Sequence, residues 1–369
     1  MTIISLTLLS ILSILAINYY IDPANQFFLA RSFDENIANI LLDNKVVMLR
    51  SNYNERLFKK VMLAKLSARP DVLVLGSSHV MSIDHDLLNT KSLFNAYVTN
   101  PAATLEDDIA LYYLYQKRGW KPKTVIIGLD SWILDKKLGW EGWKALLPEY
   151  FAGKRLFMKG EEASSYYGNI RSTFEKYSQL LSFDYLKASV QHKPLYLYVD
   201  EKKHDRSMAA DVLISSNSNE CPTCAMIYPD GSRMPAQIYA SRSAEEVEEL
   251  SRKAIKHLDH DNSYTELDPV YMNIFESFIS YLLAQHVNVI FYLPPYAPPA
   301  YDEMEKDKNY KIMRVSEEYF RSIALKYHLI TIGSYNPRLL GLETNNFYDP
   351  THLKKEGFNI VFHQSSPML

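Results

Sequence analysis

The sequence has few of the features that mark a metal-binding or nucleic-acid-binding protein. Only two of its 369 residues are cysteine, and its formal net charge is −3, with 40 basic against 43 acidic residues. This balance excludes the strongly basic footprint of a nucleic-acid-binding protein and leaves no acidic tail. Internal repeats, low-complexity tracts and extended linkers are also absent. The length suits one large domain or two smaller ones.

The two cysteines, Cys221 and Cys224, form a single Cys-x-x-Cys motif. Zinc sites of this type usually need a second pair or histidines at matching spacing. The nearest candidates, His257 and His260, have a spacing that is equally ordinary for a solvated helix end. A redox role is disfavoured because no βαβ pattern surrounds the motif. We expect a structural disulfide if the domain lies outside the cytoplasm, with metal binding and redox activity as alternatives.

Charge is missing from the start of the chain, where no charged residue precedes Asp22. The run from Ile3 to Ile17 is apolar apart from serine and threonine, and Tyr19 and Tyr20 follow it. With these tyrosines the segment approaches the length of a membrane-spanning helix. We predict a membrane anchor at residues 1–21, with the rest of the chain extracytoplasmic, either periplasmic or on the cell surface. A cleaved signal peptide and a buried core helix are the alternatives.

Short apolar runs alternate with helical patterns through much of the remaining chain. Runs of this kind are typical of strands that are buried on both faces of a parallel sheet. The pattern therefore predicts an α/β fold with a mainly parallel sheet. The expected strands are Asp71–Leu75, Ser92–Val98, Thr124–Leu129, Val287–Leu293 and Leu329–Ile332, and the expected helices include Thr104–Gln116, Val270–Gln285, Ser316–Tyr327 (with Ser316 as N-cap) and Leu353–Phe362.

The alternation is interrupted in the middle of the chain, which divides the sequence into five segments. Beyond the anchor at 1–21, residues 22–69 form a helical lead-in and residues 70–136 the first part of the α/β core. Residues 137–267 form a mostly helical insertion, and residues 268–369 complete the core. The insertion is either part of a substrate-binding surface or scaffolding.

Two polar motifs stand out against this framework. The first predicted strand ends in Gly76-Ser77-Ser78-His79, and Asp349 and His352 lie near the C-terminus. The carboxyl ends of parallel strands are where α/β proteins bind ligands. A serine, an acid and a histidine in this order can serve as nucleophile, orienting group and base. Alternatively, Asp349 caps the closing helix and His352 is an ordinary polar residue on it.

These two motifs resemble the first and last sequence blocks of the SGNH/GDSL hydrolases, which are Gly-Asp-Ser and Asp-x-x-His. The resemblance covers both ends of the core but not the middle of the chain. It implies a three-layer α/β/α, flavodoxin-like core, with Ser78 as nucleophile, His352 as base and Asp349 as orienting acid. Ser77 replaces the family's aspartate, which does not belong to the triad. Such a triad needs no metal or organic cofactor.

The remaining family blocks, which supply oxyanion donors, are altered in this sequence. The exit of the second strand has no glycine, and Asp130 stands where an asparagine would match. A carboxylate repels an oxyanion unless it is protonated or turned away. The Ser78 amide and Asn100 are the expected donors. Ser77 and His79 are further candidates for substrate contact, although a surface or packing role suits His79 as well.

The resemblance implies an enzyme that transfers an acyl group through Ser78. The acceptor is water in an esterase or deacetylase, and a carbohydrate hydroxyl in an O-acyltransferase of cell-surface polysaccharide. The expected partners are an acylated carbohydrate, the membrane and other envelope biosynthesis proteins, and no nucleic acid. The alternative is a catalytically silent SGNH-like protein that binds or assembles an envelope polysaccharide. The altered oxyanion blocks and the 27 tyrosines motivate this alternative.

Overall fold

A computed structural model describes residues 2–21, 31–49, 53–135, 139–158, 177–182, 186, 189–190, 212–254, 265–307 and 310–363. Five parallel strands form the central sheet in the order β3-β2-β4-β8-β9. This is the order of doubly wound, flavodoxin-like sheets, whose switch point lies between the first and third strands in sequence. The strands are β2 (Val72–Leu75), β3 (Leu93–Asn95), β4 (Thr124–Gly128), β8 (Asn288–Leu293) and β9 (Ile330–Gly333).

Side chains that alternate along these strands enter two separate cores. Leu73 and Leu75 of β2 join the larger core, whereas Val74 between them joins the smaller one. Helices cover both faces, so the sheet is the middle of three layers, as predicted. The larger core receives α2 (Arg31–Leu42), α3 (Glu55–Lys65), α4 (Leu105–Lys117), α5 (Leu147–Lys154), α11 (Pro269–Ala284) and α13 (Lys311–Tyr327). The smaller core receives α10 (Ala244–Ala254) and α14 (Lys355–His363), and α12 (Pro298–Lys306) contributes to both.

The five strands and four helices predicted for the core are confirmed, with shifts at their ends. Thr104 precedes α4 as expected, and its amide donates a hydrogen bond to Asp107 Oδ2 (3.0 Å). The prediction that Ser316 caps a helix is wrong, because α13 begins at Lys311. Ser316 lies buried within α13, and its hydroxyl donates to the Ser131 carbonyl (3.1 Å).

A second sheet lies beside the first, and the sequence predicts only its β6–β7 hairpin, through the turn signal at Tyr228–Ser232. Its four antiparallel strands have the order β5-β1-β6-β7. The insertion predicted to be mostly helical supplies three of them, and the lead-in predicted to be helical supplies β1. A strand of two or three residues is too short to show an alternating pattern in the sequence. The strands are β1 (Val47–Leu49), β5 (Val212–Ile214), β6 (Ala225–Ile227) and β7 (Arg233–Met234), and the short helix α9 (Gln237–Ala240) follows them.

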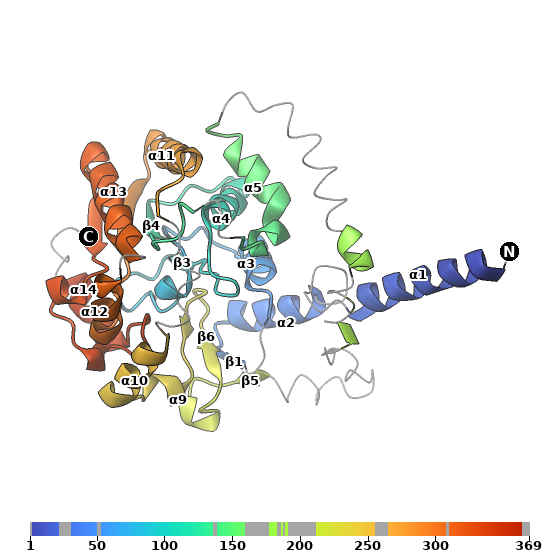
Figure 1. Cartoon of the computed structure of the whole chain (residues 1–369), viewed down its shortest axis with the longest axis horizontal. Coiled ribbons are helices and arrows are strands. Elements are labelled where there is room, and N and C mark those ends of the chain that lie inside the picture. The colour runs from blue at the N-terminus through green and yellow to red at the C-terminus, as the bar shows by residue number, and fades with distance from the viewer. Residues whose placement is uncertain are drawn as a thin grey trace.

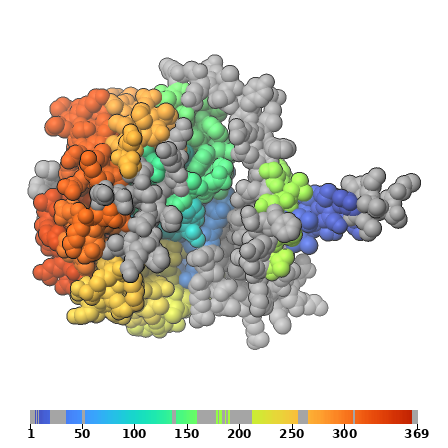
Figure 2. Space-filling view, viewed as in Figure 1, coloured from blue at the N-terminus to red at the C-terminus, as the bar shows by residue number. Residues whose placement is uncertain are grey.

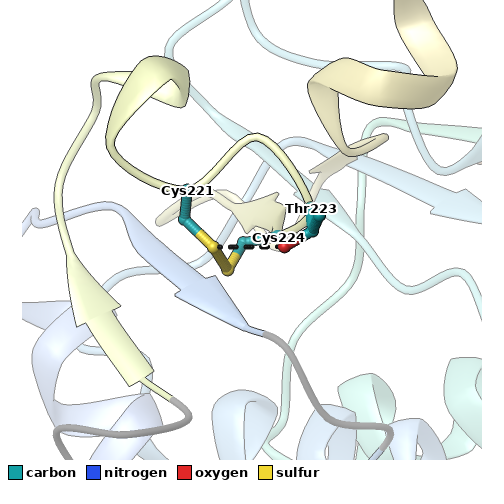
Figure 3. The surroundings of a disulfide bond; sticks show 3 residues. All are labelled: Cys221, Thr223 and Cys224. Carbon is teal, nitrogen blue, oxygen red and sulfur yellow. Dashed lines mark hydrogen bonds between the residues drawn. A yellow bond between two sulfur atoms is a disulfide. The ribbon is translucent and has the colours of Figure 1, made fainter.

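Cys221 and Cys224 form a disulfide in the turn between β5 and β6 (Figure 3). Their Cα atoms are 5.3 Å apart, and both residues are buried against Met48 of β1. The redox alternative requires exposed sulfur atoms beside a cleft, which this burial does not provide. His257 and His260, the candidate zinc partners, lie outside the described residues.

The N-terminal segment forms helix α1 (Thr2–Ile21), which projects from the body of the molecule (Figure 1 and Figure 2). Where it meets the body, the Asn18 side-chain amide donates to the Leu180 carbonyl (2.8 Å). The helix itself is therefore present as predicted. No helix among the described residues is both long enough and apolar enough to cross a membrane, so the predicted spanning anchor is not found.

Candidate active site

The candidate site lies at the carboxyl edge of the parallel sheet, at its switch point between β2 and β4. The chain leaves β2 at Gly76 and enters a short 3₁₀ helix, Ser78–Val80. Gly76 has φ of +138°, which side-chain-bearing residues rarely adopt, and it packs closely on Gly128 of β4. Two glycines thus let the two strands approach each other where the nucleophile turn begins.

The turn that carries Ser78 is fixed from both ends. Ser77 caps the 3₁₀ helix, because its hydroxyl accepts a hydrogen bond from the His79 amide (3.2 Å). Asn95, fully buried at the end of β3, donates from Nδ2 to the carbonyls of Val80 (2.7 Å) and Ile83 (2.8 Å). Ser77 therefore supports the nucleophile turn, and its buried hydroxyl is not presented to a substrate.

Ser78, His352 and Asp349 form a continuous hydrogen-bonded chain. His352 Nε2 lies 2.7 Å from Ser78 Oγ, and His352 Nδ1 lies 2.8 Å from Asp349 Oδ2. A hydroxyl bonded to one ring nitrogen, with a carboxylate bonded to the other, is the arrangement that activates serine nucleophiles. The fold thus joins a serine and a histidine that are 274 positions apart in the chain.

Asp349 is held by its own loop as well as by His352. Its Oδ1 accepts hydrogen bonds from the amides of Thr351 (2.8 Å) and His352 (2.9 Å). Burial alone would raise the pKa of Asp349, but His352 and these amides lower it to about 2. The carboxylate is therefore ionised at neutral pH. Because α14 begins only at Lys355, Asp349 does not cap the closing helix, contrary to the alternative interpretation.

The loop that carries the histidine is tied to the neighbouring strand exits. The ring of Tyr348 stacks on His352, with centroids 5.4 Å apart and planes 9° apart. The Ala297 amide, just beyond β8, donates to the Pro350 carbonyl (2.9 Å). The Tyr335 hydroxyl, just beyond β9, donates to the Leu129 carbonyl (2.6 Å). Loops from three strands therefore hold His352 in position.

Asp130, which stands in the place of the expected asparagine, is turned toward His79. The two side chains are buried, and Asp130 Oδ1 lies 2.5 Å from His79 Nδ1. The His79 ring lies 5.0 Å from the His352 ring, measured between centroids, and 5.8 Å from that of Trp132. A second carboxylate–imidazole pair thus lies directly beside the first.

Asn100, the other proposed oxyanion donor, is not joined to the site. It is exposed on the loop after β3, and its backbone carbonyl accepts a hydrogen bond from Arg56 Nη1 (3.3 Å). Among the described residues, no hydrogen bond links its side chain to Ser78, His352 or His79. The structure therefore gives Asn100 no role at the nucleophile.

The hairpin of the second sheet packs on the loop that follows Ser78. The Arg233 amide donates to the Met81 carbonyl (2.8 Å). Lys59 is fully buried and donates from Nζ to the carbonyls of Asn95 (2.7 Å) and Gly231 (2.5 Å). Burial lowers the pKa of Lys59 to about 7, despite opposing carboxylates. A neutral amine still has the two N–H groups that these carbonyls require.

A pocket of about 180 Å³ is lined in part by Trp132, whose ring lies 5.8 Å from that of His79, measured between centroids. Three of the four tryptophans in the sequence line it: Trp132, Trp140 and Trp143. Tyr271 and Glu106 also line it, and the Tyr271 hydroxyl donates to the Glu106 carboxylate. The pocket thus combines aromatic surfaces with carboxylate oxygens beside the candidate catalytic groups.

No group of three or more histidine, cysteine, aspartate or glutamate side chains in the described ranges is arranged to hold a metal ion.

No protein-family model matches the chain, and no curated protein matches it as a relative. The site therefore has to be interpreted from its own geometry. Sequence motifs do not point to Asn95, Tyr348 or Lys59. The one signal for any of them is that Asn95 is polar within the otherwise apolar run Leu93–Val98.

Proposed function

We propose that the protein is an SGNH-like serine enzyme that transfers acyl groups through a covalent acyl-Ser78 intermediate. The observation that carries this proposal is the hydrogen-bonded chain from Ser78 through His352 to Asp349. The position of the serine at the switch point of a doubly wound parallel sheet supports it. Its substrates are esters, and the acceptor is water or a carbohydrate hydroxyl of cell-surface polysaccharide.

The reaction follows from the roles of the three residues. Ser78 Oγ attacks the ester carbonyl while His352 Nε2 takes the hydroxyl proton, and Asp349 stabilises the resulting imidazolium. The tetrahedral intermediate collapses, the carbon–oxygen bond to the leaving alcohol breaks, and that alcohol takes the proton from His352. Water or a sugar hydroxyl then attacks the acyl carbon while His352 takes its proton. The bond between the acyl carbon and Ser78 Oγ breaks, and Ser78 Oγ takes the proton back from His352.

Two further observations support the choice of acceptor and compartment. The pocket lined by Trp132, Trp140 and Trp143 offers aromatic faces for the C–H surface of a sugar ring and carboxylates for its hydroxyls. The Cys221–Cys224 disulfide suits an oxidising, extracytoplasmic compartment. Both agree with a substrate in the cell envelope.

Trapping the intermediate tests the proposal. The protein is mixed with p-nitrophenyl acetate, quenched in acid and digested, and the peptides are mapped by mass spectrometry. We expect acetyl on Ser78 in the wild type and none in Ser78→Ala. Adding oligosaccharide acceptors before the quench distinguishes transfer from hydrolysis, because transfer yields acetylated sugar.

A silent binding protein remains the second candidate, and the tryptophan-lined pocket is the observation that favours it. Folded protein that never acquires acetyl on Ser78, yet binds oligosaccharides in a manner that Trp140→Ala abolishes, would establish binding in place of catalysis. Tryptophan fluorescence titration measures this binding directly.

A further inference from the structure

We infer that His79, held by Asp130, is a further catalytic residue that donates a hydrogen bond from Nε2 to the oxyanion formed at Ser78. This inference rests on the proposed acyl transfer and concerns the asparagine donor that this sequence lacks. Asp130 occupies the position of that donor and cannot itself donate as a carboxylate. Its hydrogen bond to His79 replaces the lost amide with an imidazole.

The geometry leaves one nitrogen of His79 available to a ligand. Nδ1 is bonded to Asp130 Oδ1 at 2.5 Å, and among the described residues no hydrogen bond is made to Nε2. His79 directly follows Ser78 in the chain, and its ring lies 5.0 Å from that of His352. The His79 ring therefore borders the Ser78–His352 pair, and the oxyanion formed at Ser78 is the ligand that we assign to Nε2.

The buried carboxylate explains how the ring can act as a donor. Asp130 Oδ1 accepts a hydrogen bond from the Nδ1–H group of His79, and a ring that carries a proton on each nitrogen also presents an N–H at Nε2. When Ser78 Oγ bonds to the carbonyl carbon, the π electron pair of the carbonyl moves to its oxygen. The resulting oxyanion accepts a hydrogen bond from the Nε2–H group of His79. The proton stays on His79 as the oxyanion forms and collapses, so His352 alone carries out proton transfer.

Burial of the His79–Asp130 pair strengthens the proposed hydrogen bond from His79 Nε2 to the oxyanion. Both side chains are almost fully excluded from solvent, at 5% exposure for His79 and 1% for Asp130. Charged donors in such water-excluded sites stabilise developing charge far more than in solution, and they need no reorganisation during the reaction. Removing one oxyanion donor typically lowers kcat by about 10²–10³-fold.

Three variants of the full-length protein test the role: His79→Ala, His79→Gln and Asp130→Asn. We expect His79→Ala to lower kcat for p-nitrophenyl acetate by about 10²–10³-fold with little change in KM. His79→Gln should recover part of the loss, because its amide can donate from near the position of Nε2. Asp130→Asn should lower kcat more than tenfold. The matched control is His85→Ala, which removes an exposed histidine paired with Asp86 and should leave the rate unchanged.

A second readout separates catalysis from structure. A trifluoromethyl ketone forms a tetrahedral adduct with an oxyanion on serine, so its affinity should fall in parallel with kcat across the variants. Folded His79→Ala that keeps wild-type kcat and ketone affinity would overturn the inference. If the wild type itself never becomes acylated at Ser78, the proposed function fails instead, and the two failures are thereby distinguished.

Discussion

The two sheets of this molecule contribute differently to the candidate active site. The five-stranded parallel sheet places Ser78 and Asp130 at the exits of adjacent strands, and loops tied to β8 and β9 bring His352 to them. The four-stranded antiparallel sheet carries none of the proposed catalytic groups. Its hairpin instead contacts the loop after Ser78 through the Arg233 amide, and the buried Lys59 of α3 joins the hairpin at Gly231 to Asn95 of β3. The parallel sheet positions the proposed catalytic residues, and the antiparallel sheet packs against the turn that carries Ser78.

This division explains why the catalytic edge can be precise although its residues lie on loops. Productive geometry requires reacting groups to be held within a fraction of an ångström by their surroundings. Here Asn95 donates hydrogen bonds to the Val80 and Ile83 carbonyls beside the nucleophile, and Lys59 in turn donates to the Asn95 carbonyl. Substitutions at the parallel-sheet edge should therefore affect rate first, and substitutions at the second sheet should affect stability first.

The largest effect is expected at the catalytic edge. His352→Ala removes the base and should lower kcat for p-nitrophenyl acetate at least about 10⁴-fold while leaving the unfolding temperature nearly unchanged. His363→Ala, which removes an exposed histidine at the end of α14, is the matched control. An activity within tenfold of the wild type in folded His352→Ala would show that Ser78 does not depend on this histidine.

At the junction of the two sheets, Lys59 should make stability depend on pH. Its pKa is about 7 in the folded protein against 10.5 ordinarily, so between these values the unfolded chain holds a proton that the folded chain has released. Stability should therefore rise with pH from 7 to 9, by up to about 1.4 kcal/mol per pH unit. Urea unfolding of the wild type and of Lys59→Met measures this slope.

Lys59→Met should flatten the slope, because methionine keeps the apolar stem and has no titrating group. The expected loss of two hydrogen bonds to the carbonyls of Asn95 and Gly231 lowers stability at pH 9. Equal slopes in the two proteins would show that Lys59 is not the source of the pH dependence.

A smaller effect is expected where β4 meets the nucleophile turn. A Cβ atom added at Gly128 would collide with Val80 Cγ1, so Gly128→Ala should lower the free energy of unfolding by about 1–3 kcal/mol. It should also slow acylation, since Val80 lies two residues beyond Ser78. In the Val80→Ala background, Gly128→Ala should lower the free energy of unfolding by clearly less. Additive costs in this double-mutant cycle would contradict the predicted collision.

The smallest effect is expected at the far side of the second sheet. Replacing Cys221 and Cys224 together by serine removes a cross-link that closes a very short loop, which should lower the free energy of unfolding by about 1–2 kcal/mol. Ester hydrolysis should stay within twofold of the wild type. A large loss of activity without unfolding would mean that the disulfide region takes part in the site.

The same contrast between sheets explains what the sequence could predict. The runs at β2, β4 and β8 are apolar, β-branched and bounded by proline or glycine, so each strand is visible on its own. The strands of the second sheet are too short to carry a pattern. Moreover, β1 pairs with β5 and β6 from more than 160 positions away, which no local signal reports.

The residues of the candidate site also differ in how far the sequence alone predicts them. The order of Ser78, Asp349 and His352 is readable because each lies in a motif that resembles a known family. The pairing of His79 with Asp130 depends on β2 and β4 being neighbours, which is a property of the sheet and not of either motif. Lys59 looks like an exposed position of an amphipathic helix, but it is buried against Phe94 and Tyr97 and donates to the Gly231 carbonyl of the second sheet's hairpin.

The most direct test of the account is covalent labelling by a serine-directed fluorophosphonate, followed by mass spectrometry of the digested protein. The wild type should carry one adduct, on Ser78. His352→Ala should carry almost none in the same time, while the His363→Ala control is labelled like the wild type. Folded wild-type protein that remains unlabelled, or that is labelled elsewhere, would contradict the claim that Ser78 is an activated nucleophile.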